Sequence, residues 1–451
     1  MKIIIVGCGK VGMTLAAELN KDGHDITVID KNPYAVTATT NNVDVLGLVG
    51  NGAVYNVQIE AGVAGADLLI ACTDSDELNM LCCLIAKKAG DARTIARIRD
   101  PEYSSEIRYI RDELNLSMAI NPEQAAAGEI AQLLRFPSAI KIDTFTRGRV
   151  EIMKFIVPEG SVLNDMRVQE VFSRLGRKVL ICALERGEDV LIPSGPTFMR
   201  AGDKLSVLAQ PGESMEFFRQ VGIENNAVKT VLMVGGGKIT YYLAKMLEET
   251  HIKIKIIEEN ADRCNFLSDA LPKAMIIHGD GSSQELLLEE GIRQVEAFAA
   301  LTGFDEENIM LSLYAATQSK AKLITKVNRI AFDNVVNALK LGSVIHPKRI
   351  CADMILQYVR AMQNASGSNV KTLYKLTDNG GEALEFNVGK DFPGAGIPLE
   401  KLRLKNNLLV ASINRKGKII TPSGKDTIEE GDTAIIVTTN AGLLDLKDIL
   451  A

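Results

Sequence analysis

One long pattern occurs twice in this sequence, and it constrains the fold more than any other feature. IIIVGCGKV (3–11) recurs as VLMVGGGKI (231–239), so Gly7 corresponds to Gly235, 228 residues later. This self-similarity indicates a tandem duplication, in which each half holds a large unit followed by a small one. Later segments keep the spacing to within one residue: TVID (27–30) with KIIE (255–258), GNG (50–52) with GDG (279–281), TDSDELNM (73–80) with TGFDEENIM (302–310), IARI (95–98) with ITKV (324–327), and IPSGPTFMRAGDKLSVL (192–208) with TPSGKDTIEEGDTAIIV (421–437).

The large unit alternates apolar strands with amphipathic helices. Such alternation predicts parallel βαβ units. The predicted class is therefore α/β, with two Rossmann-like doubly wound parallel sheets, each followed by a small α+β domain. In the first copy the expected strands are 2–6, 25–29, 43–49, 66–71, 93–98 and 118–120, and the expected helices are 10–21, 53–60, 76–89 and 103–114.

The small unit has short strands separated by turn residues, which is typical of a compact α+β domain. Its strands are expected within 154–161, 178–195 and 202–209, with a helix near 164–174. The connectors at 121–138 and 346–364 are predicted to be packed helices, and NASGSN (364–369) a flexible joint. The predicted domains are 1–138 (Rossmann-like), 139–225 (small α+β), 226–365 (Rossmann-like) and 366–451 (small α+β).

Composition narrows the class of protein. The chain has 451 residues, 46% hydrophobic and 24% charged, as in soluble globular proteins. The apolar stretch after Lys2 is too short for a signal peptide, and no apolar run is long enough to span a bilayer, so a cytoplasmic protein is expected. A net charge of −6 argues against nucleic acid as the main partner. Seven cysteines and four histidines show no metal-ligand spacing, so buried thiols and no metal are expected.

Gly7, Gly9 and Gly12 form G-x-G-x-x-G between an apolar strand and a helix. Here glycine allows a tight turn, close approach of bare backbone to a pyrophosphate, and close packing of helix on strand. Asp30 ends the second strand, where a carboxylate accepts hydrogen bonds from ribose hydroxyls and repels a 2′-phosphate. NAD(H), or another adenine nucleotide with an unphosphorylated ribose, is therefore favoured over NADP(H). The alternative is a Rossmann sheet that keeps the turn but has lost its ligand.

Other residues at the carboxyl ends of the parallel strands complete a predicted first site, because ligands of such sheets bind at that edge. Thr73 is expected to bond the ribose and Arg97 a phosphate. The whole set is Gly7, Cys8, Gly9, Lys10, Val11, Gly12, Asp30, Gly50, Asn51, Thr73, Asp74, Arg97 and Arg99.

The second copy predicts a second site for NAD(H) or ATP/ADP. Thr240 stands where the third glycine belongs, and its β-branched side chain is expected to push the helix off the sheet and loosen the pyrophosphate seat. The set is Gly235, Gly236, Gly237, Lys238, Ile239, Glu258, Gly279, Asp280, Thr302 and Lys326.

Catalytic residues are not apparent. A dehydrogenase needs a proton donor facing the nicotinamide, yet no histidine recurs at equivalent positions of both copies. There is no P-loop, and Ser194 and Ser423 are interpreted as turn residues. Binding without chemistry is therefore predicted. An NAD-dependent oxidoreductase with an unidentified substrate stays open as the alternative, and a sensor acting on a transcription partner is disfavoured because no basic DNA-reading segment is visible.

These residues carry a family resemblance: GCGKVG (7–12), DITVID (25–30), TDSDELNM (73–80), IARIRDPEY (95–103) and the duplication. The chain resembles the peripheral NAD-binding regulatory subunit of Trk-type bacterial potassium uptake systems, a tandem regulator-of-K⁺-conductance (RCK/KTN) protein. The resemblance implies a homo-tetramer forming a cytoplasmic ring of eight RCK units, peripheral at the inner face of the cell membrane. The ring would gate a membrane-embedded potassium-translocating subunit in response to NAD(H) and ATP/ADP. Helices 103–114 and 121–135, with counterparts around 332–362, would form the ring contacts.

Overall fold

The chain forms two compact units in the computed structural model. The first unit is Met1–Ala131 with Lys229–Leu356, and the second is Gln132–Val228 with Gln357–Ala451. Each unit therefore combines equivalent parts of the two repeats. The structure describes residues 1–175, 179–187, 189–223, 227–328, 336, 339, 341–364, 370–376, 381–440, 443 and 445–451.

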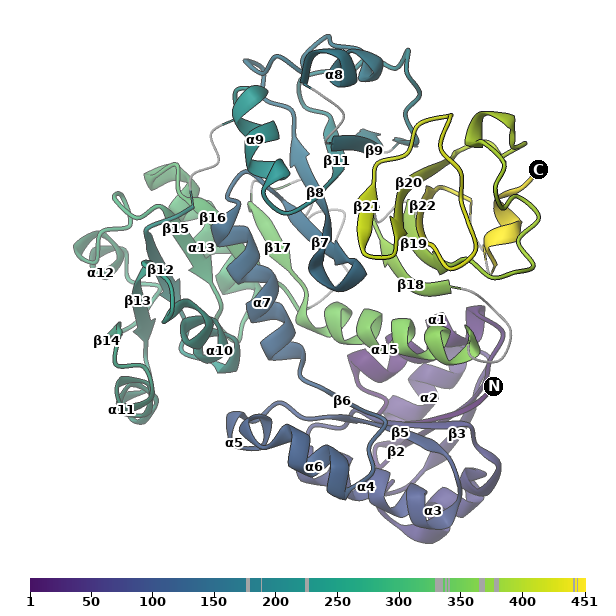
Figure 1. Cartoon of the computed structure of the whole chain (residues 1–451). Coiled ribbons are helices and arrows are strands. Elements are labelled where there is room, and N and C mark those ends of the chain that lie inside the picture. Colours follow the sequence, from purple (N-terminus) through teal and green to yellow (C-terminus); the bar gives the residue numbers. More distant parts are fainter. Residues whose placement is uncertain are drawn as a thin grey trace. The chain divides into compact units, whose positions relative to one another are not determined.

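The first Rossmann copy is a six-stranded parallel sheet of order β3-β2-β1-β4-β5-β6, as expected for a doubly wound fold (Figure 1). Its strands are β1 (Lys2–Val6), β2 (Asp25–Asp30), β3 (Leu46–Val49), β4 (Leu68–Ala71), β5 (Arg93–Arg97) and β6 (Met118–Ile120). Its helices are α1 (Lys10–Lys21), α2 (Pro33–Asn42), α3 (Tyr55–Glu60), α4 (Asp76–Ala89), α5 (Pro101–Ser105), α6 (Ile107–Glu113) and the connector α7 (Pro122–Arg135).

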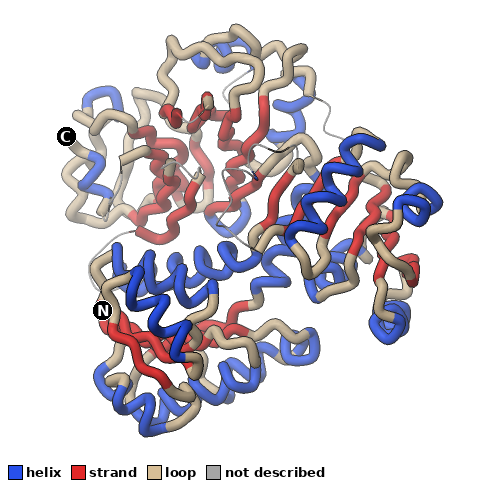
Figure 2. The backbone as a smooth tube through the Cα atoms, turned by 180° about the vertical axis from the view of Figure 1, so that it is seen from behind, coloured by secondary structure: helices blue, strands red, loops and turns tan. Residues whose placement is uncertain are grey.

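The second copy repeats this sheet as β14-β13-β12-β15-β16-β17, again parallel. Figure 2 shows the strands of each copy as a layer flanked by helices. The strands are β12 (Thr230–Val234), β13 (Lys253–Glu258), β14 (Ala274–His278), β15 (Ala297–Ala300), β16 (Lys322–Lys326) and β17 (Ser343–Ile345). The helices are α10 (Lys238–Leu247), α11 (Ala261–Ala270), α12 (Gln284–Glu289), α13 (Asp305–Gln318) and the connector α15 (Pro347–Asn364).

Burial explains why these segments fold as they do. Strand β4 is buried along its whole length, which is expected of a central parallel strand covered on both faces. Helix α1 buries Leu15 and Leu19, which are spaced for one helical face. The side chain of Ser75 caps α4 by accepting from the Leu78 amide at 3.1 Å, so this helix begins where the sequence predicted.

The second unit holds the two small domains, each built on a five-stranded antiparallel sheet, so the predicted α/β and α+β classes are confirmed. One sheet is β10 (Asp189–Leu191), β9 (Val179–Arg186), β11 (Lys204–Ala209), β8 (Val150–Ile156) and β7 (Lys141–Phe145), with helices α8 (Val168–Leu175) and α9 (Glu213–Gln220). The other is β18 (Val370–Lys375), β19 (Glu382–Asn387), β22 (Thr433–Thr438), β20 (Leu408–Arg415) and β21 (Lys418–Ile420). One apolar cluster joins the sheets, including Ile152, Cys182, Ala411 and Val437.

The duplication is visible in one ion pair that each small domain contains. In the first, the guanidinium of Arg186 donates to both carboxylate oxygens of Asp203 at 2.8 and 2.7 Å. In the second, Arg415 makes the same forked contact with Asp432 at 3.0 and 2.8 Å. Both aspartates are almost fully buried, so each depends on its arginine for charge compensation.

Some predicted elements were wrong in detail. The segment 103–114 is two helices, α5 and α6, because the backbone leaves the helical region at Glu106. The strand expected at 43–49 begins only at Leu46. The prediction missed β7 and α9. Of the predicted joint and ring helices, residues 365–369 and most of 332–340 lie outside the described residues. No helix in the described ranges has the length and apolarity to cross a membrane.

Gly52→Ala should destabilise the first Rossmann copy, because an added Cβ would lie 2.2 Å from Val6 Cγ1 in the sheet core. Overpacking of a filled core costs about 1–3 kcal/mol, so the first urea unfolding transition should move to lower concentration. Gly65→Ala is the matched control, because nothing lies within 4 Å of a Cβ there. Equal midpoints for the two variants would contradict this packing.

Candidate functional site

The first glycine loop leaves bare backbone exposed above the edge of the sheet. Gly7 adopts a φ of 105°, which favours glycine, and its amide donates to Ile29 O at 2.8 Å. A Cβ at Gly12 would lie 1.8 Å from Gly7 O, whereas nothing lies within 4 Å of a Cβ at Gly9. No side chain caps α1 at Gly9. The first amides of α1 are thus available to an anion, as the glycine pattern predicted.

An acidic residue at the end of the second strand holds each loop in place. The Cys8 amide donates to Asp30 Oδ2 at 2.7 Å, and the Asn32 amide donates to Asp30 Oδ1 at 2.8 Å. In the second copy, the Gly236 amide donates to Glu258 Oε2 at 2.6 Å. Each carboxylate oxygen keeps a lone pair that can accept from a ribose hydroxyl.

Thr73 follows β4 at the carboxyl edge of the sheet. Its hydroxyl donates to Asn79 Oδ1 at 2.7 Å and keeps lone pairs that can accept, so its bond to a ribose stays a prediction. Asn79 is completely buried and also accepts from the Thr73 amide and donates to Arg97 O, at 2.8 and 2.9 Å. Sequence reasoning missed Asn79. Its repetition as Asn308, which makes the same contacts to Thr302 and Lys326, was the available signal.

The two arginines lie at the end of β5, as predicted. Arg97 Nη2 donates to Thr73 O at 2.6 Å and to Asp74 Oδ1 at 3.3 Å. Its side chain is only 9% exposed, and Nε is buried without a hydrogen-bond partner. The Arg99 guanidinium donates to Asp74 O, while its amide donates to Asp76 Oδ2 at 2.8 Å. The orphaned Nε of Arg97 fits a site completed by an anion.

Glycine turns follow β3 and β14 at the carboxyl edges of the two parallel sheets. The Gly50 amide donates to Asp30 O at 2.9 Å, and Asn51 Oδ1 accepts from the Ala53 amide at 3.0 Å. In the second copy, the Gly279 amide donates to Glu258 O at 3.0 Å. The side chain and amide of Ser282 both donate to Asp280, and these hydrogen bonds lower the pKa of the Asp280 carboxyl.

Thr240 affects the second loop less than expected. The Thr240 hydroxyl donates to Gly235 O at 2.5 Å, so the side chain fills the space between loop and helix. The Gly235 amide still donates to Ile257 O at 2.9 Å, and Gly237 has φ −67° and ψ −173°, close to −68° and −175° at Gly9. The predicted loosening of the second loop is therefore wrong, because the Thr240 hydroxyl bonds the loop and the loop keeps the backbone geometry of the first copy.

Arg263 is a feature of the second site that sequence reasoning missed. Its Nε donates to Gly236 O at 2.6 Å, and its guanidinium lies 4.6 Å from the centre of the Phe266 ring. Burial lowers the pKa of Arg263, and Glu258 acts against that shift. Lys326, which was predicted, donates from Nζ to Leu301 O at 3.4 Å, and burial lowers its pKa.

Polar contacts join the two Rossmann copies within the first unit. Lys238, from the second glycine loop, forms an ion pair with Asp100 at 2.8 Å. The Tyr242 hydroxyl donates to Arg99 O and lies 2.9 Å from both Ser104 Oγ and Asn121 Nδ2. The start of α10 is thereby tied to the segment that carries Arg99.

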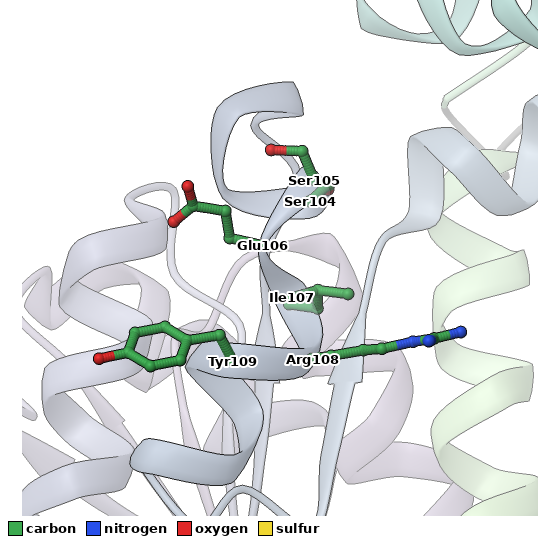
Figure 3. Close-up of a pocket in the computed structure, with 6 residues that line it drawn as sticks. All are labelled: Ser104, Ser105, Glu106, Ile107, Arg108 and Tyr109. Atoms are coloured by element: carbon green, nitrogen blue, oxygen red, sulfur yellow. The ribbon is translucent and has the colours of Figure 1, made fainter.

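A separate hollow of about 730 Å³ lies at the break between α5 and α6. Figure 3 shows that Arg108 and Tyr109 point in opposite directions from this helix. The hollow is open and lined by one short segment, 104–109, so it is not part of either glycine-loop site.

Two of the histidines contact backbone carbonyl oxygens. His278 Nε2 lies 3.0 Å from Glu259 O, and His346 Nδ1 lies 3.0 Å from Val327 O. Over the described ranges, no group of three His, Cys, Asp or Glu side chains is arranged to hold a metal ion.

Two Rossmann-like domains with open glycine loops, each followed by a small antiparallel domain, define a tandem Rossmann-type protein. The TrkA-N domain family matches residues 3–122 and 231–347, and the TrkA-C domain family matches residues 152–222 and 383–451. The chain therefore belongs to the TrkA family, and the predicted resemblance is confirmed.

Known relatives agree with this family. The chain is 30% identical over 446 residues to "Trk system potassium uptake protein TrkA homolog 1" of Methanosarcina mazei, with 97% of each chain covered. The structure titled "GsuK channel bound to NAD" matches with a TM-score of 0.63 at 17% identity, covering 97% of this chain and 76% of that chain. "Crystal structure of the GsuK bound to ADP" matches with a TM-score of 0.51 at 14% identity, covering 79% and 69%. At these identities the structural likeness shows the fold alone.

Cys8 should resist alkylation in the native protein although it lies in the first glycine loop. Burial, with the adjacent Asp30 carboxylate, raises the pKa of the Cys8 thiol to about 11, so at pH 8 only about 0.1% is thiolate, the reactive form. Native protein treated with iodoacetamide at pH 8 should show no carbamidomethyl group on Cys8 by peptide mass spectrometry. Denatured protein should be modified there, and rapid native modification would contradict the buried loop.

Proposed function

We propose that this chain is a nucleotide-sensing regulatory subunit that gates a membrane potassium uptake protein. The observation that carries the proposal is the pair of open glycine loops, in each of which a backbone amide donates to a carboxylate. The family supports it, because its relatives are named for Trk potassium uptake. The relatives' names describe transport and no catalysed reaction. We therefore favour nucleotide binding without catalysis over the oxidoreductase alternative.

The ligands that fit are adenine nucleotides. We assign NAD(H) to the first site, with Asp30 accepting from the ribose and the amides after Gly9 donating to the pyrophosphate. The second site, with Glu258 and Gly237 in the same places, takes NAD(H) or ATP/ADP. The open space at both loops and the orphaned Nε of Arg97 support this fit.

Such a ligand regulates only through different affinities for two conformations of the protein. The contacts between Lys238 and Asp100, and between Tyr242 and Arg99, supply a path for that difference. A nucleotide that moves α10 changes the segment carrying Arg99, so the two sites are expected to influence each other reciprocally.

We further propose a homo-tetramer whose eight RCK units form a cytoplasmic ring, held at the inner face of the membrane by the potassium-translocating partner. Equivalent apolar side chains are exposed on equivalent helices: Leu81 on α4 is 45% exposed and Met310 on α13 is 66% exposed. Tyr109, on the neighbouring helix α6, is 67% exposed. An apolar face repeated in both copies suits contacts between units. The four predicted domains are retained in this proposal.

Asp30→Ala should weaken NAD(H) binding at the first site, and Glu258→Ala should weaken binding at the second. Each substitution removes the ribose acceptor and the hydrogen bond from the loop amide to the carboxylate, so we expect the nucleotide affinity of that site to fall about tenfold or more. Isothermal titration with NAD⁺, NADH, ATP and ADP checks this, with Asp44→Ala, away from both loops, as the control. Unchanged nucleotide binding in both variants would contradict the assignment of Asp30 and Glu258 to the two sites.

The oxidoreductase alternative is tested on the wild-type protein. Incubation with NADH and carbonyl substrates should leave the absorbance at 340 nm constant. Turnover that disappears in Gly9→Asp would show that the nucleotide is a reagent. Co-purification with a membrane potassium-transport subunit is expected.

Leu81→Asp combined with Met310→Asp should break the ring into smaller species, because charges in a buried apolar contact are strongly unfavourable. Light scattering after size exclusion measures the mass. Met215→Asp is the matched control, because Met215 is 54% exposed on α9 of a small domain. A tetramer that persists in the double variant would show that these helix faces lie outside the ring contacts.

A further inference from the structure

A basic side chain of the second glycine loop is paired with an acid of the first repeat. Lys238 is the first residue of α10 and directly follows Gly237, and its Nζ lies 2.8 Å from Asp100 Oδ2. The two side chains are 38% and 37% exposed, so solvent and small ions reach the pair. An exposed ion pair contributes little to stability, so another anion can replace the carboxylate at low cost.

The carboxylate of this pair is fixed in place, whereas the ammonium can move. Asp100 Oδ1 accepts from the Glu102 amide at 3.1 Å and caps α5, and the Asp100 amide donates to Asp76 Oδ2 at 2.8 Å. Lys238 reaches the carboxylate through a flexible four-carbon stem. An anion at the start of α10 can therefore draw the ammonium away while Asp100 stays where it is.

The side chain of Lys238 starts beside the place where a phosphate is expected. Side chains in an α-helix lean toward its amino end, so Lys238 extends past the start of α10. No described side chain caps this helix, and no described atom lies within 4 Å of a Cβ at Gly237. A phosphate bound to the first amides of α10 would come within reach of the ammonium. Asp100 and that phosphate therefore compete for one cation.

This end of the second site also faces other acids of the first repeat. The hydrogen bond from Ser75 lowers the pKa of Glu77, and the charge of Lys238 lowers it further. Burial raises the pKa of Glu123, and the charge of Lys238 acts against that shift. Of these three described acids, Asp100 is the one that forms an ion pair with Lys238. The local field thus disfavours a phosphate, and Asp100 is the acid that directly occupies its cation.

The sequence shows that this ion pair has no equivalent at the matching position of the first site. Lys10 corresponds to Lys238, but position 329, which corresponds to Asp100 at the 229-residue spacing, is arginine. Two like charges cannot form an ion pair. Competition of this kind therefore distinguishes the second site from the first.

We propose that Asp100 is an affinity-determining residue of the second site, contributed by the first repeat, which competes with the phosphates of a bound nucleotide for Lys238. A phosphate forms a stronger charge-assisted hydrogen bond with an ammonium than an exposed carboxylate does, so binding opens the ion pair between the two Rossmann copies. Tyr242, one turn along α10, keeps its hydrogen bond to Arg99 O. The bound and unbound states then differ in one contact between the copies, as regulation by a ligand requires. This inference rests on the proposed function.

The affinity test uses the full chain with Asp30→Ala, so that the second site dominates a calorimetric titration with ATP. Adding Asp100→Asn should raise ATP affinity about threefold, because the competing charge is lost while asparagine still caps α5. Lys238→Gln should lower ATP affinity about tenfold, and in that background Asp100→Asn should change it less than about twofold. Glu102→Gln, which removes the same charge two residues away, is the matched control and should leave ATP affinity unchanged.

A second measurement follows the ion pair itself in the wild-type chain. A carbodiimide activates a carboxylate and leaves as a urea when an adjacent amine attacks, so it should join Asp100 to Lys238 through an amide bond. Peptide mass spectrometry detects this cross-link. Saturating ATP should suppress the cross-link, because the phosphates then hold the ammonium.

The inference would be overturned by unchanged ATP affinity in Asp100→Asn, by an equal rise with and without Lys238, or by a cross-link that persists when ATP is bound. Failure of ATP to bind the second site, in a chain that still binds NAD⁺, would overturn it as well. All these results leave the proposed function intact. Absence of any nucleotide binding by the wild-type chain would overturn the proposed function itself.

Discussion

The first site depends on a hydrogen bond between the glycine loop and the carboxylate that ends the second strand. The Cys8 amide donates to Asp30 at 2.7 Å, and the Gly236 amide donates to Glu258 at 2.6 Å in the second copy. This bond brings the first turn of the chain against the end of β2 and leaves the helix start uncovered. A polar ligand can then meet helix amides and a ribose acceptor together.

The two copies keep this geometry and differ in what surrounds it. Thr240 stands where the first copy has Gly12 and donates to Gly235 O, and Arg263 adds a cation that the first copy lacks. Two sites with the same fold and different charges can bind different nucleotides. The contacts between the copies allow binding at one site to change the affinity of the other.

The sequence predicted features that depend on local pattern. Strand β1 and helix α4 match their predicted bounds because burial and capping act within a few residues. The bond between Thr73 and Asn79 was not predicted, because Asn79 reaches Thr73 only when α4 folds back on the sheet. The pairing of Tyr242 with Asn121 depends on how two domains meet, 121 residues apart in sequence, and no spacing rule reveals it.

Native mass spectrometry of the intact oligomer, equilibrated with NAD⁺ and ATP, distinguishes a nucleotide that is a signal from one that is a reagent. If it is a signal, up to two adenine nucleotides per chain should bind and be recovered with unchanged mass after denaturation. No bound nucleotide, or nucleotide recovered as a chemically altered product, would contradict it.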